Sequence, residues 1–170
     1  MVEREKEETP MQPRIQNPAQ AAPGAMEALL SLAKVVSDAA AKAGVPQSTV
    51  DLVETRASQI NGCAVCLDMH SRAAKKHGVT DQQLHTLAAW RDSPYFDEAQ
   101  QAALALAEAG TRLADRSDAV SDDVWDRATK HFDEPAITAL VLATGLINNF
   151  NRLNVMTGQV AGEWTARYAD

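Results

Sequence analysis

Apolar residues recur at helical spacing along most of the chain beyond Gly24. Residues 25–43 show this pattern clearly, at Met26, Leu29, Leu30, Ala33 and Val36. Three-and-four spacing is the period of one face of an α-helix, and Gly44-Val45-Pro46 is expected to end that helix. We find no segment with the strict alternation of a half-buried strand, no clear sequence repeat and no glycine-rich phosphate loop. The pattern therefore predicts an all-α protein.

Capping residues and helix breakers divide the rest of the chain into further helices. Ser48, with Asp51 three residues later, is expected to open a helix that ends at Asn61-Gly62. The next helix is predicted to run from about Cys63 to His77, with Gly78 as its C-terminal cap. The later helices are predicted to begin at four capping residues: Thr80, Asp97, Ser121 and Asp133.

The last of these helices has an unusual distribution of apolar residues. From Ile137 to Ile147 it is apolar around much of its circumference. Such a helix is expected to be buried on more than one side. The helix that opens at Asp97, whose capping partner is Gln100, is predicted to run through Ala114.

The first 24 residues differ from the rest of the chain. They hold four of the seven prolines, show no apolar periodicity and are rich in Glu and Gln. This composition predicts a flexible N-terminal tail over residues 1–24, followed by one helical domain over residues 25–170.

Composition narrows the class of protein further. The 170 residues are 45% apolar but only 5% aromatic, so small aliphatic side chains must form most of the core. A net charge of −7 argues against non-specific binding of nucleic acid, which needs a basic surface. No apolar run approaches the roughly 18 residues of a membrane-spanning helix, and the first residues do not resemble a signal peptide. We therefore expect a cytoplasmic protein that binds neither nucleic acid nor membranes.

The candidate chemistry is concentrated in residues 55–70. This segment holds both cysteines of the chain, Cys63 and Cys66, and His70 follows four residues after the second. In a cytoplasmic protein such a pair is more often redox-active or metal-bound than a structural disulfide. At about 100° per residue, the three side chains share one face of a helix. If Asn61 is the N-cap, Cys63 lies in the first turn, where a thiolate is favoured, whereas Cys66 is placed to meet His70.

Two other interpretations of the cysteines stay open at this point. They could be small buried side chains beside a core histidine, because free cysteines are often buried. They could also bind zinc together with His70, although structural zinc usually takes four ligands. The remaining histidines, His77, His85 and His131, are not spaced to supply the fourth ligand, and His77 is expected to be a charge partner at a helix C-terminus.

Glu54 is the nearest candidate acid to this segment. By helix propensity alone it is a solvated residue of the preceding helix. The break at Asn61-Gly62 could instead fold that helix back and bring Glu54 to His70, where a carboxylate would orient the imidazole and raise its basicity.

The residues around the cysteines extend into a longer pattern. The run from Glu54 to His70, together with residues 87–94 and 147–152, resembles the carboxymuconolactone decarboxylase superfamily, and within it the alkylhydroperoxidase D-like branch. The resemblance covers roughly residues 25–160. It implies an all-helical fold, assembly into homotrimers or multiples of trimers, and a thiol-dependent peroxidase that needs no cofactor or metal.

The resemblance also implies a role for each site residue. Cys66 would attack the hydroperoxide and Cys63 would then close the disulfide, while His70 and Glu54 would relay the proton. An external dithiol or protein reductant would restore the thiols. One departure is Val65, where the best-known relatives carry a histidine. The decarboxylase members lack the cysteine pair, so their lactone chemistry is not carried over.

Two alternative functions remain. One is a non-redox decarboxylase or hydrolase that uses Glu54 and His70 as acid and base. The other is a thiol-bearing stress sensor without catalytic turnover.

Overall fold

A computed structural model describes residues 11–162 of the chain. These residues form eight α-helices and two 3₁₀ helices and contain no strand, which confirms the all-α class. The elements are α1 (Pro18–Ala21), α2 (Ala25–Lys42), α3 (Gln47–Asn61), α4 (Ala64–Lys76), α5 (Asp81–Thr86), η1 (Leu87–Asp92), α6 (Glu98–Thr111), η2 (Leu113–Asp115), α7 (Asp122–Thr129) and α8 (Glu134–Thr157). Among these helices, none is long and apolar enough to cross a membrane.

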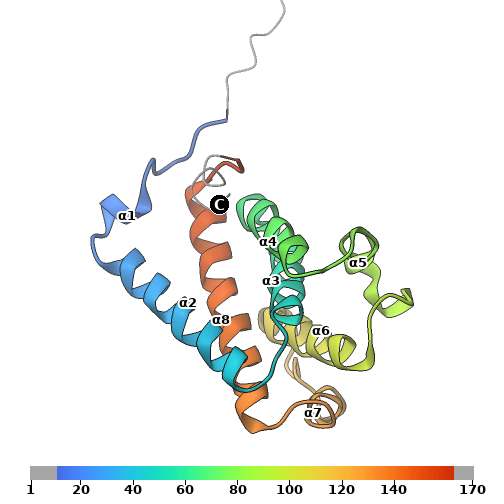
Figure 1. Ribbon diagram of the computed structural model, residues 1–170. Helices are drawn as coiled ribbons and strands as arrows, with labels where there is room; N and C mark the ends of the chain where they lie inside the picture. Colours follow the sequence, from blue (N-terminus) through green and yellow to red (C-terminus); the bar gives the residue numbers. More distant parts are fainter. Residues whose placement is uncertain (1–10, 163–170) are drawn as a thin grey trace, which may run out of the picture.

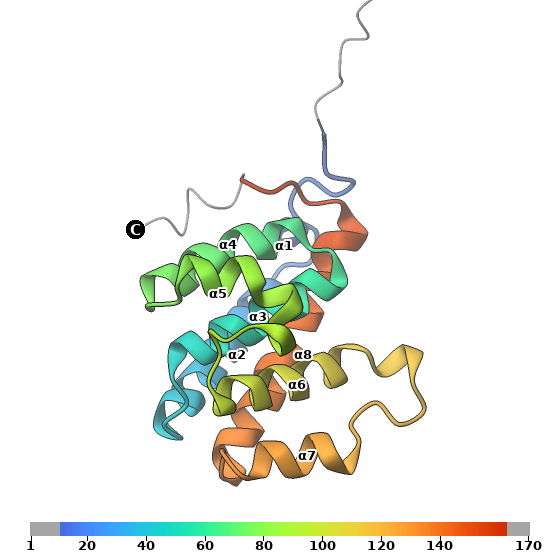
Figure 2. The same cartoon turned by 90° about the vertical axis from the view of Figure 1, so that its right-hand side faces the viewer.

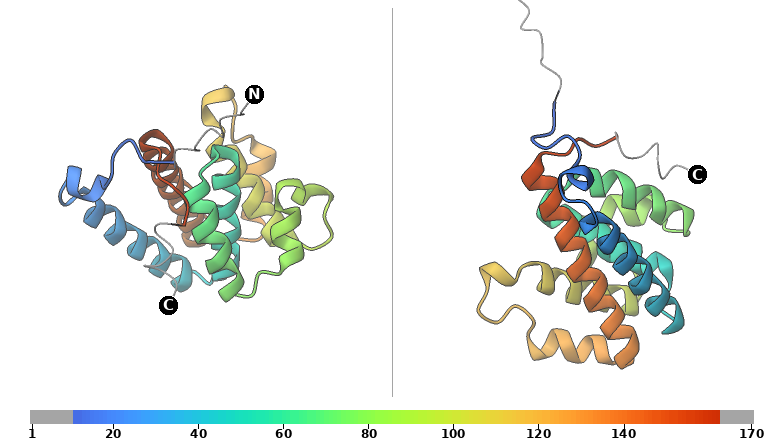
Figure 3. Two further views of the ribbon diagram at one scale, coloured as in Figure 1. Left: turned by 90° about the horizontal axis from the view of Figure 1, so that it is seen from above. Right: turned by 90° about the vertical axis from the view of Figure 1, so that its left-hand side faces the viewer.

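Helices α3 and α8 form the centre of the molecule. Helix α3 packs against α4, α6 and α8, and α8 also packs against α2 and α6. Helices α1 and α4 lie near one end of the molecule and α7 near the other (Figures 1 and 2). Figure 3 shows α8 between α2 and α4. Helices α1, α2, α4 and α8 therefore surround one region at the upper end of Figure 1.

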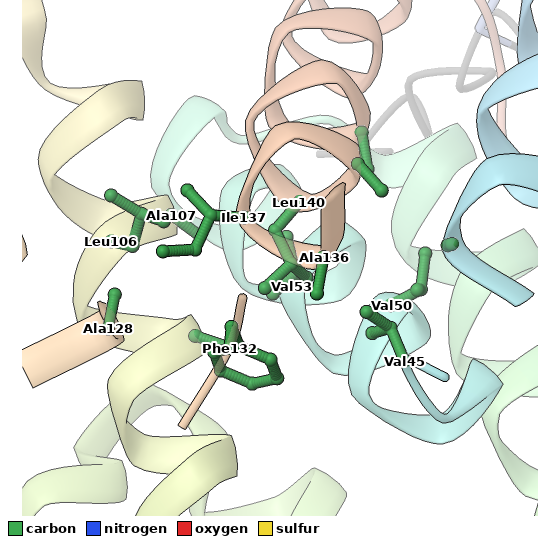
Figure 4. Packing of buried hydrophobic residues seen from close by; sticks show 14 of the residues in the cluster. Val45, Val50, Val53, Leu106, Ala107, Ala128, Phe132, Ala136, Ile137 and Leu140 are labelled. Atoms are coloured by element: carbon green, nitrogen blue, oxygen red, sulfur yellow. The ribbon is translucent and has the colours of Figure 1, made fainter. Parts of the chain in front are cut away.

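Small and branched side chains fill the main core, as the low aromatic content predicted. Figure 4 shows Val53 of α3 close to Leu140 of α8, with Ile137 of α8 between this pair and Leu106 of α6. Alanines occupy many of the buried positions of α6 and α8, and because their side chains are short the helices can approach closely. These alanines are Ala102, Ala103, Ala107, Ala136, Ala139 and Ala143.

The capping boxes at two predicted helix starts are present. Thr80 caps α5 with Gln83, and Asp97 caps α6 with Gln100. The predicted start at Ser48 is wrong, because α3 begins at Gln47 after Pro46 and has no side-chain cap. Proline presets its own backbone angle and can position a helix start without a capping side chain. Helix α6 is also shorter than predicted, since it ends at Thr111 and the chain continues as the 3₁₀ helix η2.

A further prediction is wrong, because Asn61 is not the N-cap of α4. It is the last residue of α3, and Gly62 follows with a left-handed backbone (φ 67°). The N–H of Cys63 donates to the carbonyl of Ser58 at 3.0 Å, which closes the end of α3. Cys63 itself is therefore the N-cap of α4.

Residues 11–24, part of the predicted tail, include α1 and contact the end of α8. The N–H of Arg14 donates to the carbonyl of Thr157 at 2.7 Å, and Gln159 Nε2 donates to the carbonyl of Ile15 at 2.7 Å. Residues 1–10 of the predicted tail lie outside the described residues.

A buried carboxylate connects α6 to α3 and η1. Glu108 Oε1 accepts hydrogen bonds from Arg56 Nε at 2.6 Å and from Trp90 Nε1 at 3.1 Å, and Glu108 Oε2 pairs with Arg91. Burial alone would raise the pKa of Glu108, but the two guanidinium groups and Trp90 lower it below its ordinary value. The negative charge of Glu108 is thus compensated by two arginines, and the cluster joins three elements of the fold.

Candidate functional site

The turn between α3 and α4 is fixed to α8 by the side chain of Asn61. Its Nδ2 donates to Asn148 Oδ1 and to Asn151 Oδ1, each at 2.9 Å. Asn151 in turn donates to Ser58 Oγ at 3.0 Å. These groups are largely shielded from water, where a satisfied hydrogen-bond network is rigid. The network therefore sets where α4 begins relative to α8.

Both thiols lie at this junction as free cysteines. The Sγ of Cys63 accepts a hydrogen bond from the N–H of Cys66 at 3.4 Å, so the sulfur occupies the place of a capping oxygen. The exposed fractions of Cys63 and Cys66 are only 1% and 3%. A sulfur at a helix N-cap faces the positive end of the helix dipole, which favours a thiolate.

Asn154 of α8 faces both sulfurs. Its Nδ2 lies 3.3 Å from Cys66 Sγ and 3.9 Å from Cys63 Sγ. An amide N–H stabilises a thiolate more than a thiol, because it donates to the negative charge. Asn154 therefore supports a negative charge on either sulfur.

The two cysteines have opposite pKa shifts. The pKa of Cys63 is lowered to about 6 despite its burial. The main cause is a hydrogen bond that the Cys66 thiol donates to Cys63, and the Cys66 N–H and the Asn154 amide contribute further. The same hydrogen bond, burial and the adjacent negative charge raise the pKa of Cys66. Since Cys63 also lies at the N-cap of α4, the pair is expected to carry its negative charge on Cys63 and its proton on Cys66.

Glu54 and His70 form an ion pair across the two helices. His70 Nδ1 lies 2.9 Å from Glu54 Oε2, and the side chains are 21% and 19% exposed respectively. The turn at Gly62 thus folds α3 back along α4 as the second interpretation of Glu54 predicted, and Glu54 is not a solvated residue. Burial alone would lower the pKa of His70, but the charge and hydrogen bond of Glu54, with smaller effects from Asp51 and Cys63, raise it above its ordinary value. The Glu54 carboxylate therefore favours the protonated form of His70.

His70 and Cys66 share a cavity but are not bonded to each other. Within residues 11–162 no hydrogen bond joins His70 to either cysteine, although the spacing of Cys66 and His70 would allow one. The cavity measures about 250 Å³ and also contains Glu54 and Asn154. The rest of its wall is mostly apolar and includes Met26, Leu30, Met69, Leu146 and Phe150. Val65, which stands where the best-known relatives carry a histidine, also lines it.

The remaining histidine of α4 belongs to another contact. His77 caps the C-terminal end of α4, and its Nδ1 lies 2.6 Å from Oδ2 of the buried Asp51. His77 is thus a partner of α3 and not part of the cavity. Within the described part of the chain, no three His, Cys, Asp or Glu side chains are grouped so that they could hold a metal ion.

Asn154 is the main site residue that the sequence analysis missed. The three asparagines Asn148, Asn151 and Asn154 recur every three residues along α8. Polar residues at helical spacing inside an otherwise apolar helix are a signal of a buried polar contact. The pattern could have been noticed, but its partners could not, because the cysteines lie about 90 residues earlier in the chain.

A match to a known protein family covers the segment that holds both cysteines, Glu54 and His70. Residues 23–109 match the model of the carboxymuconolactone decarboxylase family. The uncharacterised protein YdfG of Bacillus subtilis is 33% identical over 140 residues, which cover 82% of this chain and 91% of YdfG. The chain therefore belongs to the carboxymuconolactone decarboxylase family.

Further similarities point to the alkylhydroperoxidase D-like branch. The solved structure of a protein of unknown function from Agrobacterium tumefaciens has a TM-score of 0.80 at 32% identity, and the match covers 88% of this chain and 98% of that one. An antioxidant defence role of the AhpD kind has been suggested for that protein. Alkyl hydroperoxide reductase AhpD of Hyphomonas neptunium is 44% identical over 41 residues, 24% of this chain and 23% of AhpD. The debrominase Bmp8 shares the fold with a TM-score of 0.73 at 19% identity, covering 89% of this chain and 78% of its own, so the fold also serves another activity.

Removing the Asn154 amide is expected to raise the pKa of the thiolate. In the reduced wild-type protein, ultraviolet absorbance of the thiolate should rise as the pH increases through about 6. In Asn154→Leu that rise should move towards the ordinary thiol value of about 8.5, because one donor to both sulfurs is lost. Asn149→Ala, an exposed change on the same helix, is the matched control. Identical titrations of Asn154→Leu and wild type would show that Asn154 does not stabilise the thiolate.

Proposed function

We propose that this protein is a thiol-dependent peroxidase that reduces hydroperoxides with the Cys63–Cys66 pair. The observation that carries the proposal is the shared cavity, in which Cys66 lies with the His70–Glu54 ion pair and directly adjoins Cys63. Membership of the family and the AhpD-like relatives support the same class of reaction. The substrate is a hydroperoxide, and the reductant is an external dithiol or protein thiol.

We assign the attack on the hydroperoxide to Cys66 because its sulfur is reached from the cavity, although the resting charge is on Cys63. Cys66 lines the cavity and Cys63 does not. Because the two sulfurs share a hydrogen bond, the proton of Cys66 can pass to Cys63 and leave the thiolate on the sulfur that faces the substrate. That thiolate attacks the terminal peroxide oxygen and the O–O bond breaks, which gives a sulfenic acid on Cys66 and an alkoxide. The alkoxide takes the proton of the His70 imidazolium and leaves as an alcohol.

The second step closes the disulfide. Cys63 attacks the sulfenic sulfur of Cys66, the S–S bond forms, and the hydroxide that leaves takes the Cys63 proton and departs as water. His70 is then neutral. A dithiol restores the pair by supplying two electrons and two protons, one of which returns to Cys66 and the other to His70. In this scheme His70 acts first as an acid, and the only role of Glu54 is to hold the imidazole in its protonated form.

We place this reaction in the cytoplasm, where reduced thiols persist and a Cys-x-x-Cys pair can cycle between thiol and disulfide. At 19% identity the likeness to Bmp8 concerns the fold alone, so it does not favour a debrominase here.

Single substitutions should separate the roles of the four residues. With a hydroperoxide and excess dithiol, Cys66→Ser should abolish turnover, whereas Cys63→Ser should react once and stop at the sulfenic acid. His70→Gln should slow turnover by roughly 10²-fold, the lower range for loss of a general acid, and Glu54→Gln by less, because it acts through His70. His85→Gln, an exposed histidine away from the cavity, is the control. The readouts are peroxide consumption and the mass of the protein.

Three results would contradict this proposal. Unchanged turnover after both thiols are alkylated would favour a non-redox enzyme that uses Glu54 and His70. Consumption of one peroxide per chain, even with excess dithiol, would favour a stress sensor. A Cys63→Ser protein that fails to react with peroxide while Cys66→Ser reacts would reverse attacker and resolver.

The pH profile of turnover should have two limbs. Activity should rise as pH increases through about 6, because the thiol pair loses a proton there. It should fall at higher pH, where His70 loses the proton that it donates to the leaving oxygen. Since Glu54 raises the pKa of His70, Glu54→Gln should move the alkaline limb to lower pH and leave the acid limb nearly in place. An alkaline limb that does not respond to Glu54→Gln would show that His70 is not the acid.

We also propose that the chain assembles as a homotrimer or a multiple of one. Exposed apolar side chains lie on two helices that pack together, α2 and α8, and they are Leu32, Val35, Val141 and Leu142. A second copy would remove these side chains from water. Light scattering should give a mass three times 18.3 kDa or a multiple of that. Leu142→Glu should lower the mass while Leu113→Glu should not, and a monomer mass at all concentrations would refute the proposal.

A further inference from the structure

The two sulfurs line different cavities. Cys66 lies in the cavity with His70 and Glu54, whereas Cys63 lines a second pocket of about 440 Å³. Val65, Asn154 and Gln159 line both, so they form the partition between the two. A disulfide joining Cys63 to Cys66 would therefore be reached from two sides.

The second pocket is bounded by segments from the two ends of the described chain. Residues 11, 12 and 14 form one side, and Val155, Gly158 and Val160 at the end of α8 form another. Arg14 is fixed there by its N–H bond to Thr157 and by its Nη1, which donates to the carbonyl of Met156 at 3.0 Å. Gly158 has a left-handed backbone (φ 66°), and a Cβ at that position would lie 3.5 Å from Arg14 Cγ. Such a distance is ordinary contact, so the two hydrogen bonds are what hold Arg14 in the wall of this pocket.

We propose that this second pocket admits the reductant, so that an external dithiol attacks Cys63 from the side opposite to the peroxide. The inference rests on the proposed function for its physiological role, but the site of attack on the disulfide is independent of it. Cys63 is only 1% exposed, so a flat protein surface cannot reach its sulfur. The occupant is therefore a small dithiol. Arg14 lines this pocket, and its positive charge favours the thiolate form of the incoming sulfur.

The reduction can be written with all atoms in place. The thiolate of the dithiol attacks Cys63 Sγ, the bond between Cys63 and Cys66 breaks, and its electron pair leaves with Cys66, which takes up a proton. The second thiol of the reductant then attacks its own first sulfur, and Cys63 leaves as a thiolate. The dithiol is oxidised to a disulfide, and its second proton returns to His70.

The environment of Cys63 suits that second step. A thiol of low pKa leaves faster, and Cys63 departs as the thiolate that the Cys66 thiol and N–H and the Asn154 amide stabilise. Attack on Cys63 therefore ends in the resting state of the pair, with the charge on Cys63 and the proton on Cys66.

A matched pair of tryptophan substitutions tests the two entrances. Leu30 on α2 lines only the peroxide cavity of the two and is 46% exposed, whereas Val155 on α8 lines only the second pocket and is 47% exposed. Leu113→Trp, 60% exposed and in neither cavity, is the control. Each half-reaction is followed separately: loss of thiols from reduced protein with cumene hydroperoxide, and recovery of thiols with dithiothreitol after oxidation by diamide.

Blocked access should slow one half-reaction in each variant. Val155→Trp should slow recovery of thiols about tenfold and Leu30→Trp should slow loss of thiols about tenfold, each changing the other rate by less than about twofold. The Leu113→Trp control should change neither rate. If both variants slow the same half-reaction, or if Val155→Trp reduces as fast as wild type, the second pocket is not the entrance.

A measurement on the unaltered protein identifies the attacked sulfur directly. Diamide-oxidised protein is treated with 2-mercaptoethanol, and the freed thiol is alkylated at once with N-ethylmaleimide. Fragment mass spectra should show the mixed disulfide on Cys63 and the maleimide on Cys66, and the reverse labelling would overturn the proposal. Because diamide makes the disulfide, this result stands even if the reduced protein proves inert to hydroperoxides, which would defeat the proposed function alone.

Discussion

The turn between α3 and α4 depends on the left-handed backbone of Gly62 and on the side-chain amide of Asn61. Gly62 ends α3 one residue before Cys63, so the sulfur of Cys63 has to cap α4. Asn61 then ties the turn to α8 through Asn148 and Asn151. This arrangement folds Glu54 back onto His70 and fixes the start of α4 against the asparagines of α8.

The arrangement also decides where the protons rest. A sulfur at a helix N-cap, with a second thiol as donor, favours a negative charge, and Glu54 raises the pKa of His70 and so favours its protonated form. A cysteine pair that already holds a thiolate does not need the imidazole as a proton acceptor. What the site supplies to a substrate is a thiolate on one side of the bond to be broken and an acid on the other.

Several features of the fold and site could be read from the sequence for local reasons. The helical period, the capping boxes at Thr80 and Asp97 and the Cys-x-x-Cys spacing are properties of short segments. The N-cap at Cys63 was missed because Asn61 and Gly62 satisfy the usual signal for a helix start and for a helix end equally well. Three features could not be predicted: Asn154 as a site residue, the contacts of residues 11–15 with the end of α8, and the two separate cavities. Each depends on contacts between residues about 90 or more positions apart.

The central claim is that the fold places the resting thiolate on Cys63 and the proton on Cys66. The most direct test is nuclear magnetic resonance of reduced protein labelled with ¹³C at the cysteine β-carbons, with each signal assigned and followed as the pH is raised. The account predicts that the Cys63 signal shifts as the pH passes about 6, while the Cys66 signal shows no comparable deprotonation as long as the protein remains folded. Titration of Cys66 before Cys63, or titration of both near the ordinary thiol value of about 8.5, would contradict it.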